Sequence, residues 1–188
     1  MRKLVVSELL TLDGVMEAPG GEAGHPHTGW AGELIGPEEV AWKEQEAMDA
    51  GALLLGRVTY ESFAGAWPHR LGAFADRMNA LPKHVVSTTL GEPDWHNSTL
   101  LAGELAGAVA DLKAGAGGPI LVMGSRMLVH ALARLDLVDE YRIMLFPVLV
   151  GSGRRLFPDS PDKIPLRLVD LRAFASGISM QVFERDRG

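Results

Sequence analysis

The sequence predicts an α/β domain with a mixed, mostly parallel sheet that ends in an antiparallel hairpin. Aliphatic runs of strand length alternate with segments of helical periodicity, which favours parallel strands joined by helices. Three of these runs are almost continuously apolar, as in strands buried on both faces, at residues 4–12, 52–55 and 120–123. Residues 166–174 and 178–183 alternate apolar and polar side chains instead, and Ala175-Ser176-Gly177 between them predicts a hairpin turn.

At 188 residues the chain is long enough for one well-packed domain, and no linker or repeat divides it, so we expect a single domain over residues 1–188. Its net charge of −6 argues against nucleic acid or an anionic membrane as the main partner. The absence of cysteine excludes disulfides, thiolate catalysis and cysteine-ligated metals. No apolar run approaches the roughly 20 residues needed to cross a bilayer. Because no signal-peptide pattern follows Met1, we expect a cytoplasmic protein.

The first strand is followed by a glycine-rich segment at residues 14–36, which contains seven glycines. A long segment of this kind in a compact domain is usually a functional loop or lid, and the alternative is a plain surface loop. Pro37 suits the first position of a helix, and the carboxylates of Glu38 and Glu39 suit its first turn. A helix is therefore predicted from Pro37 to about Asp49.

The remaining elements follow from similar patterns. After the strand at residues 52–55 a helix is predicted from Thr59 to about Ala64, with Trp67-Pro68 marking its exit. Further strands are predicted at residues 84–89, 120–123 and 140–150, and further helices at residues 74–81, at residues 104–113 and after Ser125. Apolar residues at helical spacing are expected in the core, among them Met127, Leu128, Leu132 and Leu135.

Two strand-to-helix junctions could hold a phosphorylated ligand, Leu55-Gly56-Arg57-x-Thr59 and Met123-Gly124-Ser125. Glycine lets a ligand approach the main chain, backbone N–H groups collect at a helix start, and a guanidinium such as that of Arg57 suits phosphate. Ligands of open α/β sheets bind beyond the carboxyl ends of the strands, so the two junctions could grip one extended nucleotide. The alternative for each junction is an ordinary turn.

Several common signatures are absent from the sequence. It has neither the G-x-G-x-x-G dinucleotide fingerprint nor the G-x-x-x-x-G-K-[ST] loop, and it has no G-x-S-x-G elbow of a hydrolase. His25 and His27 could meet a metal from one loop, but no i, i+4 histidine pair or carboxylate partner accompanies them. No metal site is therefore predicted.

The order of three motifs resembles dihydrofolate reductase: Leu12-Asp13-Gly14-Val15-Met16, Gly56-Arg57-x-Thr59-Tyr60-Glu61 and Val122-Met123-Gly124-Ser125. The C-terminal half is still more similar to the reductase domain of the bifunctional deaminase/reductase of riboflavin biosynthesis, through residues 124–125, 137–141 and 147–157. The resemblance covers nearly the whole chain. It implies the three-layer dihydrofolate-reductase-like fold, NADPH as hydride donor and, often, a homodimer.

The resemblance also implies which residues contact the cofactor. Arg57 would contact the adenosine 2′-phosphate, Thr59 and the helix start would hold the pyrophosphate, and Leu9 would lie near the nicotinamide. Val15 and Met16 would lie by the nicotinamide, and Ser87 and Thr88 by the adenine-ribose end. Further implied cofactor contacts are Gly56 at the first phosphate junction, Gly124 and Ser125 on the other phosphate face, and the neighbouring Arg126 and Met127. The glycine-rich segment would close over this site and exclude water.

The chain departs from the family pattern at Arg126, where a further glycine is usual, so either the backbone differs there or Arg126 adds a phosphate contact. Pro37-Glu38-Glu39-Val40-Ala41-Trp42 has the Pro-x-acid-x-x-Trp spacing of dihydrofolate reductases and so places Glu39 at the catalytic acid. A partly buried glutamate with a raised pKa could relay a proton to a substrate C=N group. The alternative is an exposed first-turn Glu39 that complements the helix dipole.

Two functions follow from these observations. The first is NADPH-dependent reduction of a small heterocyclic or imine-like substrate, by an enzyme related to 5-amino-6-(5-phosphoribosylamino)uracil reductase and dihydrofolate reductase, with Phe63 and Trp67 beside the substrate. The second is a non-catalytic dimer that binds a nucleotide or small ligand in the same groove. A phosphorylated substrate would need basic groups, for which Arg70, Arg154 and Arg155 are candidates unless they are simply solvated.

Overall fold

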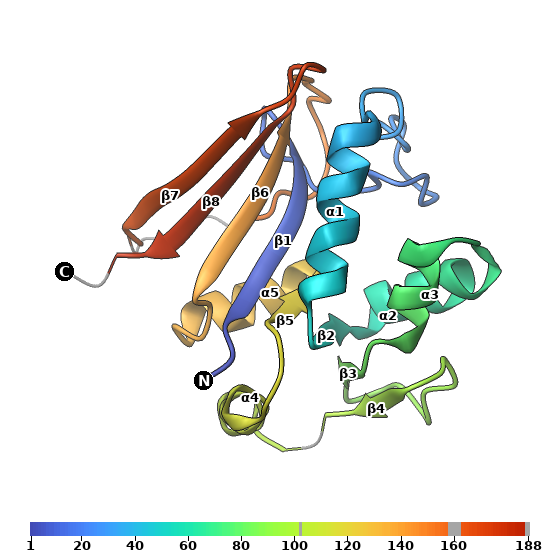
Figure 1. The fold of residues 1–188 in the computed structure, drawn as a ribbon, viewed down its shortest axis with the longest axis vertical. Coiled ribbons are helices and arrows are strands. Elements are labelled where there is room, and N and C mark those ends of the chain that lie inside the picture. The colour runs from blue at the N-terminus through green and yellow to red at the C-terminus, as the bar shows by residue number, and fades with distance from the viewer. Residues whose placement is uncertain (102, 158–162, 187–188) are drawn as a thin grey trace.

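A computed structural model describes residues 1–101, 103–157 and 163–186 of the protein (Figure 1). Its elements are, in chain order, β1 (Leu4–Thr11), α1 (Pro37–Asp49), β2 (Ala52–Gly56), α2 (Arg57–Ala66), the short 3-10 helix η1 (Trp67–His69), α3 (Ala73–Ala80), β3 (Lys83–Val86), β4 (Ser98–Leu100), α4 (Leu105–Ala114), β5 (Ile120–Val122), α5 (Arg126–Arg134), β6 (Glu140–Phe146), β7 (Leu166–Ala173) and β8 (Ser179–Arg185). Strands and helices alternate along most of the chain, which then closes with the β7–β8 hairpin.

The eight strands of the described residues form one sheet, in the order β4-β3-β2-β5-β1-β6-β8-β7. Strands β1 to β6 pair in parallel, whereas β8 runs antiparallel to both β6 and β7. The predicted mixed, mostly parallel sheet with a C-terminal hairpin is thus confirmed. β1 lies in the interior of this sheet between β5 and β6, and nearly all of its side chains are buried.

Helices cover both faces of the sheet, which is therefore the middle of three layers (Figure 1). On one face Val5, Leu53 and Leu55 pack with residues of α1, α2 and α3. On the other face Val6 and Leu54 pack with residues of α4 and α5. Successive strand residues point to opposite faces, so this double burial accounts for the almost continuous apolar runs in the sequence. None of the described helices is both long and apolar enough to cross a membrane.

Most predicted elements are present, with shifted ends. α2 starts at Arg57, two residues before the predicted Thr59, so Arg57 belongs to the first turn of the helix. β6 stops at Phe146, because Pro147 has no N–H group with which to continue the ladder. β3 stops at Val86, and the hydroxyl-bearing residues after it lie in a loop rather than in the strand, namely Ser87, Thr88 and Thr89.

One element is not predicted, and one expectation about the core is wrong. β4 is a three-residue edge strand that the sequence does not predict, because its residues lack an apolar pattern. Met127 is 65% exposed and Leu135 is 45% exposed, so neither belongs to the core. The buried face of α5 is formed by neighbours such as Leu128 and Leu132.

The glycine-rich segment is packed against the end of β6 and the loop that follows it. Val15 forms an isolated antiparallel bridge with Arg155. Trp30 packs edge-on against Phe146, with ring centroids 5.1 Å apart. Residues 20–24, in the middle of the segment, are exposed. The segment therefore covers the carboxyl end of β6 and is held at several points along its length.

Candidate functional site

The two strand-to-helix junctions lie side by side at the carboxyl edge of the sheet. β2 and β5 are neighbouring parallel strands, so the segments that leave them enter α2 and α5 next to each other. The Gly56 N–H donates to the Ser125 hydroxyl at 2.9 Å, and the Ser125 N–H donates to the Thr59 hydroxyl at 2.7 Å. The two junctions are thus one hydrogen-bonded unit, as a ligand shared between them requires.

The backbone at Gly124 and Ser125 is left-handed, with φ values of +59° and +56°. A Cβ atom on Gly124 would lie 2.9 Å from Oγ1 and 3.0 Å from Cγ2 of Thr59, which explains why glycine occupies this position. Ser125 keeps a side chain in a conformation that costs an L-residue roughly 1–2 kcal/mol. Its hydrogen bonds across the junction offset that cost and fix the start of α5.

The starts of α2 and α5 are open to an anion. No side chain caps either helix, because Gly56 has none and the Ser125 hydroxyl bonds to the Gly56 N–H and the Met123 carbonyl. The first-turn N–H groups lack partners within their own helices, and the helix dipoles favour negative charge beside them. α4 differs, since the Glu104 carboxylate accepts two N–H groups of the first turn. Phosphate is therefore favoured at α2 and α5 and disfavoured at α4.

Two guanidinium groups belong to these helix starts. Arg57 Nη1 lies 3.1 Å from both Glu61 carboxylate oxygens, in a pair whose side chains are each about half exposed. Exposed helical pairs of this kind contribute only about 0.3–0.5 kcal/mol, so Arg57 remains able to turn toward a phosphate. Arg126 is the first residue of α5 and is already helical, so no glycine is needed at its position. The left-handed conformation falls on Gly124 and Ser125 instead.

The residues expected at the two ends of a cofactor lie at this same edge. The Ser87 hydroxyl, just after β3, accepts the N–H groups of residues 89 and 90 at 3.1 and 2.9 Å, so it caps a turn, and Thr88 is exposed. Val15 and Met16 are buried just beyond β1, and Leu9 is partly buried within it. Because β1 pairs with β5, Leu9 lies on the strand next to the Gly124 junction, and Val15 and Met16 lie in the segment that follows this strand.

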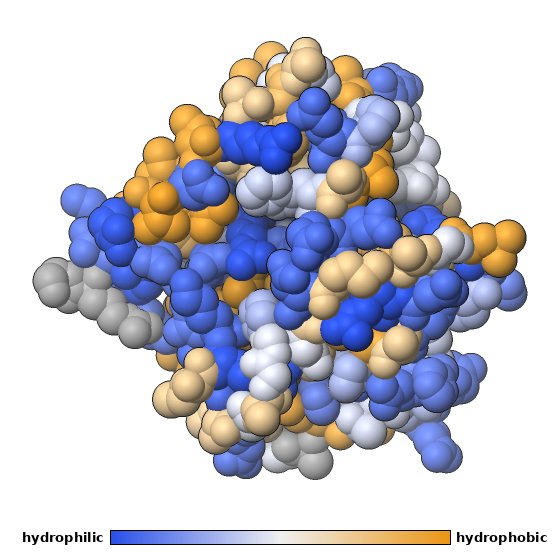
Figure 2. Space-filling view, in the orientation of Figure 1, coloured by the Kyte–Doolittle hydropathy of each residue, from blue (hydrophilic) through white to orange (hydrophobic). Residues whose placement is uncertain are grey.

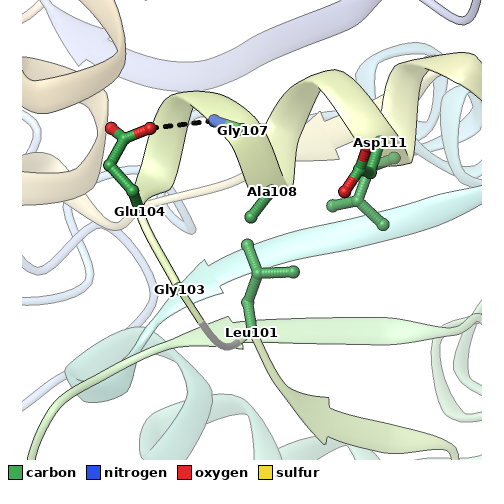
Figure 3. Close-up of a pocket in the computed structure, with 7 residues that line it drawn as sticks. Leu101, Gly103, Glu104, Gly107, Ala108 and Asp111 are labelled. Carbon is green, nitrogen blue, oxygen red and sulfur yellow. Dashed lines mark hydrogen bonds between the residues drawn. The ribbon is translucent and has the colours of Figure 1, made fainter.

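A cavity of about 490 Å³ runs along one side of α4 (Figure 3). It begins at Leu101, whose N–H donates to the Val85 carbonyl near the end of β3. Its lining combines apolar side chains with two carboxylates, from Leu101, Gly103, Glu104, Gly107, Ala108, Asp111 and Leu112. The carboxylates disfavour phosphate, and no residue predicted for the site lines this cavity. The candidate site is therefore at the two junctions.

Glu39 does not have the raised pKa that we expected of a catalytic acid. Its side chain is buried at the start of α1 and accepts hydrogen bonds from the Ser176 hydroxyl and, at 3.0 Å, from the Gly36 N–H. Burial opposes ionisation, but these bonds, the Glu39 N–H and the charge of Arg172 together lower its pKa below the usual value. Glu39 thus caps α1 as an ionised carboxylate and ties it to the β7–β8 hairpin.

The structure does not bring Phe63 and Trp67 to Glu39. Trp67 is buried against Phe63 and Phe74, with ring centroids 6.2 and 5.0 Å away. This aromatic cluster belongs to α2, η1 and α3, whereas the start of α1 lies beside the tip of the hairpin, at the top of Figure 1. The three residues expected at the substrate therefore do not lie in one pocket.

The remaining candidates are engaged locally. Arg70 lies over the Trp67 ring at 4.6 Å, and Arg154 Nε is 3.3 Å from the Glu17 carboxylate. His25 Nε2 is 3.0 Å from a backbone carbonyl in the loop after β6. Within the described residues no three His, Asp or Glu side chains gather in a way that could hold a metal ion.

A buried carboxyl that the sequence did not single out lies beside Gly124. Glu8 is in the middle of β1, is 5% exposed, and accepts a hydrogen bond from the Gly124 N–H. Burial raises its pKa well above the usual value, and the charge of Lys43 and the Gly124 N–H counteract this only in part. The one signal in the sequence is an acidic residue within an aliphatic run. Its closeness to Gly124 follows only from the register of β1 and β5.

Comparison with known proteins gives the same overall architecture. The sequence matches the RibD C-terminal domain family over residues 2–180. The uncharacterized protein YyaP of Bacillus subtilis (strain 168) is 26% identical over 187 residues, which cover 97% of this chain and 94% of YyaP.

Two solved structures resemble the chain at low sequence identity. One is a protein from Shewanella sp. PV-4 whose name proposes a role in riboflavin biosynthesis, with a TM-score of 0.76, 21% identity, and 98% and 99% of the two chains covered. The other is a diaminohydroxyphosphoribosylaminopyrimidine deaminase/5-amino-6-(5-phosphoribosylamino)uracil reductase from Thermotoga maritima. Its TM-score is 0.67 at 13% identity, over 98% of this chain and 57% of the Thermotoga chain. These likenesses confirm the predicted reductase-like fold.

Proposed function

The chain belongs to the RibD C-terminal domain family, and on that premise we propose that it is an NADPH-dependent reductase. It would transfer a hydride to a small heterocyclic or imine-like substrate. The name of the Thermotoga maritima neighbour includes a 5-amino-6-(5-phosphoribosylamino)uracil reductase, which supports this class of substrate.

One observation carries the proposal, namely the hydrogen-bonded unit formed by the starts of α2 and α5. A pyrophosphate needs several N–H donors gathered at one place, without a carboxylate that competes for them. The uncapped starts of α2 and α5 offer such donors side by side, and the bonds of Ser125 to Gly56 and Thr59 fix their spacing. The residues present at the junctions therefore fit a dinucleotide.

When bound, NADPH would supply the hydride for the reduction. Arg57 would pair with the 2′-phosphate, because a guanidinium forms strong charge-assisted hydrogen bonds with phosphate oxygens. The first-turn N–H groups after Gly56 and Ser125 would hold the pyrophosphate, and Arg126 would add positive charge beside it. An apolar wall would exclude water at the nicotinamide end, formed by Leu9, Val15 and Met16.

We further propose a homodimer that uses the exposed side of the hairpin. β7 is an edge strand of the sheet, and most of its side chains are exposed. Leu168, Val169 and Leu171 are among them, and Figure 2 shows apolar surface over the hairpin at its upper left. An exposed apolar edge strand can pair with another chain, and a second copy of this protein would cover it.

Cofactor binding tests the proposed function directly. Titration of the purified protein with NADPH, followed by nucleotide fluorescence and by thermal unfolding, should give saturable binding and a rise in Tm. NADH should bind more weakly, because it lacks the 2′-phosphate. No binding at NADPH concentrations far above the micromolar range would refute the proposal.

A second candidate function is a non-catalytic dimer that binds a nucleotide as a sensor. Glu39 favours it, because its ionised carboxylate is already engaged at the start of α1 and has no proton to donate. A protein that binds NADPH but never oxidises it with pterins, pyrimidines or quinones would support this candidate. Oxidation of NADPH by any one of these compounds would exclude it.

A further inference from the structure

Glu8 lies on β1 next to β5, and the helices that follow these two neighbouring strands lie on opposite faces of the sheet. Val6 pairs with Val122 at the end of β5, so Glu8, two residues further along β1, is level with Gly124, where the chain turns toward α5. Ligands of open α/β sheets bind between two such strands, beyond their carboxyl ends. Glu8 is therefore part of the floor of the candidate site.

One oxygen of Glu8 is buried and unused. Alternate residues of a strand point to the same face of the sheet, so Glu8 points to the same face as Val6 and Leu10. The side chains of these two residues pack on the face covered by α4 and α5. The Gly124 N–H hydrogen-bonds to the carboxyl, whereas Oε1 has no hydrogen-bond partner within the described residues. Buried polar atoms are nearly always paired in native proteins, so an exception of this kind points to a ligand or to a catalytic role.

Burial, rather than the surrounding charges, favours the neutral form of Glu8. The charge of Lys43, on the opposite face, favours ionisation of Glu8, but its Nζ is paired with Glu46 Oε2 at 2.5 Å, and the charge of Glu46 opposes that ionisation. α5 carries Arg126 and His130 in its first two turns, and His130 Nε2 is 2.6 Å from a backbone carbonyl oxygen. Burial raises the pKa of Glu8 well above the usual value, which favours a protonated carboxyl in the free protein.

We propose that Glu8 is the catalytic acid of this site and gives its proton to a substrate nitrogen when the adjacent carbon takes the hydride. The inference rests on the proposed reductase function. The C=N π bond breaks, the carbon gains a C–H bond from the hydride, and the nitrogen gains an N–H bond from the Glu8 carboxyl. Glu8 is left as a carboxylate, whose negative charge balances the positive charge of NADP⁺. Glu39 keeps its capping role at α1.

The charge left on Glu8 should change how the protein binds the two forms of the nucleotide. A carboxylate is stabilised near the cationic ring of NADP⁺ but not near the neutral ring of NADPH. Binding of NADP⁺ should therefore release the Glu8 proton. One released proton makes the affinity for NADP⁺ relative to NADPH rise about tenfold per pH unit while Glu8 titrates. Protonation of the 2′-phosphate, which both nucleotides carry, cancels in this ratio.

The experiment measures the Kd values of NADP⁺ and NADPH by calorimetry from about pH 5 to about pH 9, on either side of the neutral range. Wild type is compared with Glu8→Gln, which keeps an acceptor for the Gly124 N–H but cannot release a proton, and with Glu39→Gln as the matched control. Wild type and Glu39→Gln should show the rise of about tenfold per pH unit. In Glu8→Gln the ratio of the affinities for NADP⁺ and NADPH should not change with pH.

A ¹³C NMR titration of glutamate-labelled wild type gives a second answer without any substitution. One carboxyl should titrate above all others and move to lower pH when NADP⁺ is added. If Glu8→Gln does not fold, this measurement decides, and the absence of such a carboxyl, or of its response to NADP⁺, overturns the assignment of Glu8.

The outcomes separate the inference from the proposed function. In one outcome, both nucleotides bind to wild type with an affinity ratio of NADP⁺ to NADPH that does not change with pH. In another, Glu8→Gln keeps the same change of this ratio with pH as wild type. Either result overturns the role of Glu8 and leaves the proposed function intact. Failure of both nucleotides to bind overturns the proposed function, and the inference falls with it.

Discussion

The hydroxyl of Ser125 accepts the N–H of Gly56 at 2.9 Å and so joins two segments that are 69 residues apart in the sequence. Ser125 also donates its own N–H to Thr59 at 2.7 Å, while its backbone is left-handed. The positions of both helix starts therefore depend on this one residue. Variants at the junction should change stability and nucleotide affinity together.

Ser125→Ala should lower the free energy of unfolding by about 1–2 kcal/mol, because the Gly56 N–H loses its acceptor. Ser125→Gly removes the same hydroxyl but relieves a left-handed strain of roughly 1 kcal/mol, so it should lose less. Urea unfolding at neutral pH measures both differences. Equal stability of the two variants and the wild type would mean that this hydroxyl contributes nothing to the junction.

Gly124→Ala should disrupt the junction, because the added methyl group would clash with the Thr59 side chain. The new Cβ would lie 2.9 Å from Thr59 Oγ1 at a φ of +59°. We expect a loss of about 1–2 kcal/mol for the left-handed backbone and about 1–3 kcal/mol more for overpacking. Gly151→Ala is the matched control, since its φ is +76° and nothing lies within 4 Å of the added Cβ. If both variants lose the same free energy in urea unfolding, Thr59 is not the obstacle.

Arg57→Ala should weaken NADPH binding by about tenfold or more and leave NADH binding nearly unchanged, because only NADPH carries the 2′-phosphate. Glu61→Ala is the control, since it breaks the 3.1 Å ion pair but keeps the guanidinium. It should bind NADPH at least as well as wild type. Fluorescence titration with both nucleotides measures these affinities, and equal losses for the two would remove the 2′-phosphate role of Arg57.

Glu39 should stabilise the protein only while it is ionised. Its pKa is lower in the folded protein than in the unfolded chain, where about 4.3 is usual, so the stabilisation is complete above that value and disappears as the pH falls through the folded pKa. Glu39→Gln should lower the free energy of unfolding at neutral pH by about 1 kcal/mol, as loss of a helix cap does, and have little effect in acid.

Urea unfolding at neutral and at acid pH measures this dependence. Glu38→Gln is a suitable control, because Glu38 is an exposed neighbour in the same first turn that pairs with Arg172 at 3.2 Å. It should change stability little at either pH. A loss for Glu39→Gln that is the same in acid as at neutral pH would contradict a role for its charge.

Leu171→Lys should dissociate the proposed dimer. Leu171 is 57% exposed on the edge strand β7, and a lysine there would bring charge into an interface between two copies. Light scattering during gel filtration should give twice the 20.2 kDa chain mass for wild type and the mass of one chain for the variant. Leu135→Lys, at the exposed end of α5, should remain dimeric. A monomeric wild type would reject the dimer.

Most of the fold can be predicted, because a strand that is buried on both faces has a run of consecutive apolar residues. Leu53, Leu54 and Leu55 are apolar in succession, since they face the two helical layers in turn. β4 cannot be predicted in this way, because a short edge strand needs no apolar side chains. Its pairing with β3 depends on backbone hydrogen bonds, for which Ser98 to Leu100 carry no local signature.

The two junctions proposed to bind phosphate can be predicted from the sequence, and the proposed acid cannot. Gly56 and Gly124 each mark a junction in the local sequence, and the strand order brings them together. Glu8 depends on the register between two strands, which determines its neighbour across the sheet. Glu39 depends on Ser176, which lies 137 residues further along the chain. No local pattern contains information on contacts of this range.

The bridge between Val15 and Arg155 joins the glycine-rich segment to the loop after β6. A ligand that enters beneath one of them must displace both, so a single barrier would govern its entry and its release. Tryptic cleavage after Arg155 would loosen residues 14–36 as well, although these are distant in the sequence. The rate of ligand exchange would then be determined by the coupling of two loops rather than by the groups proposed to hold the phosphates.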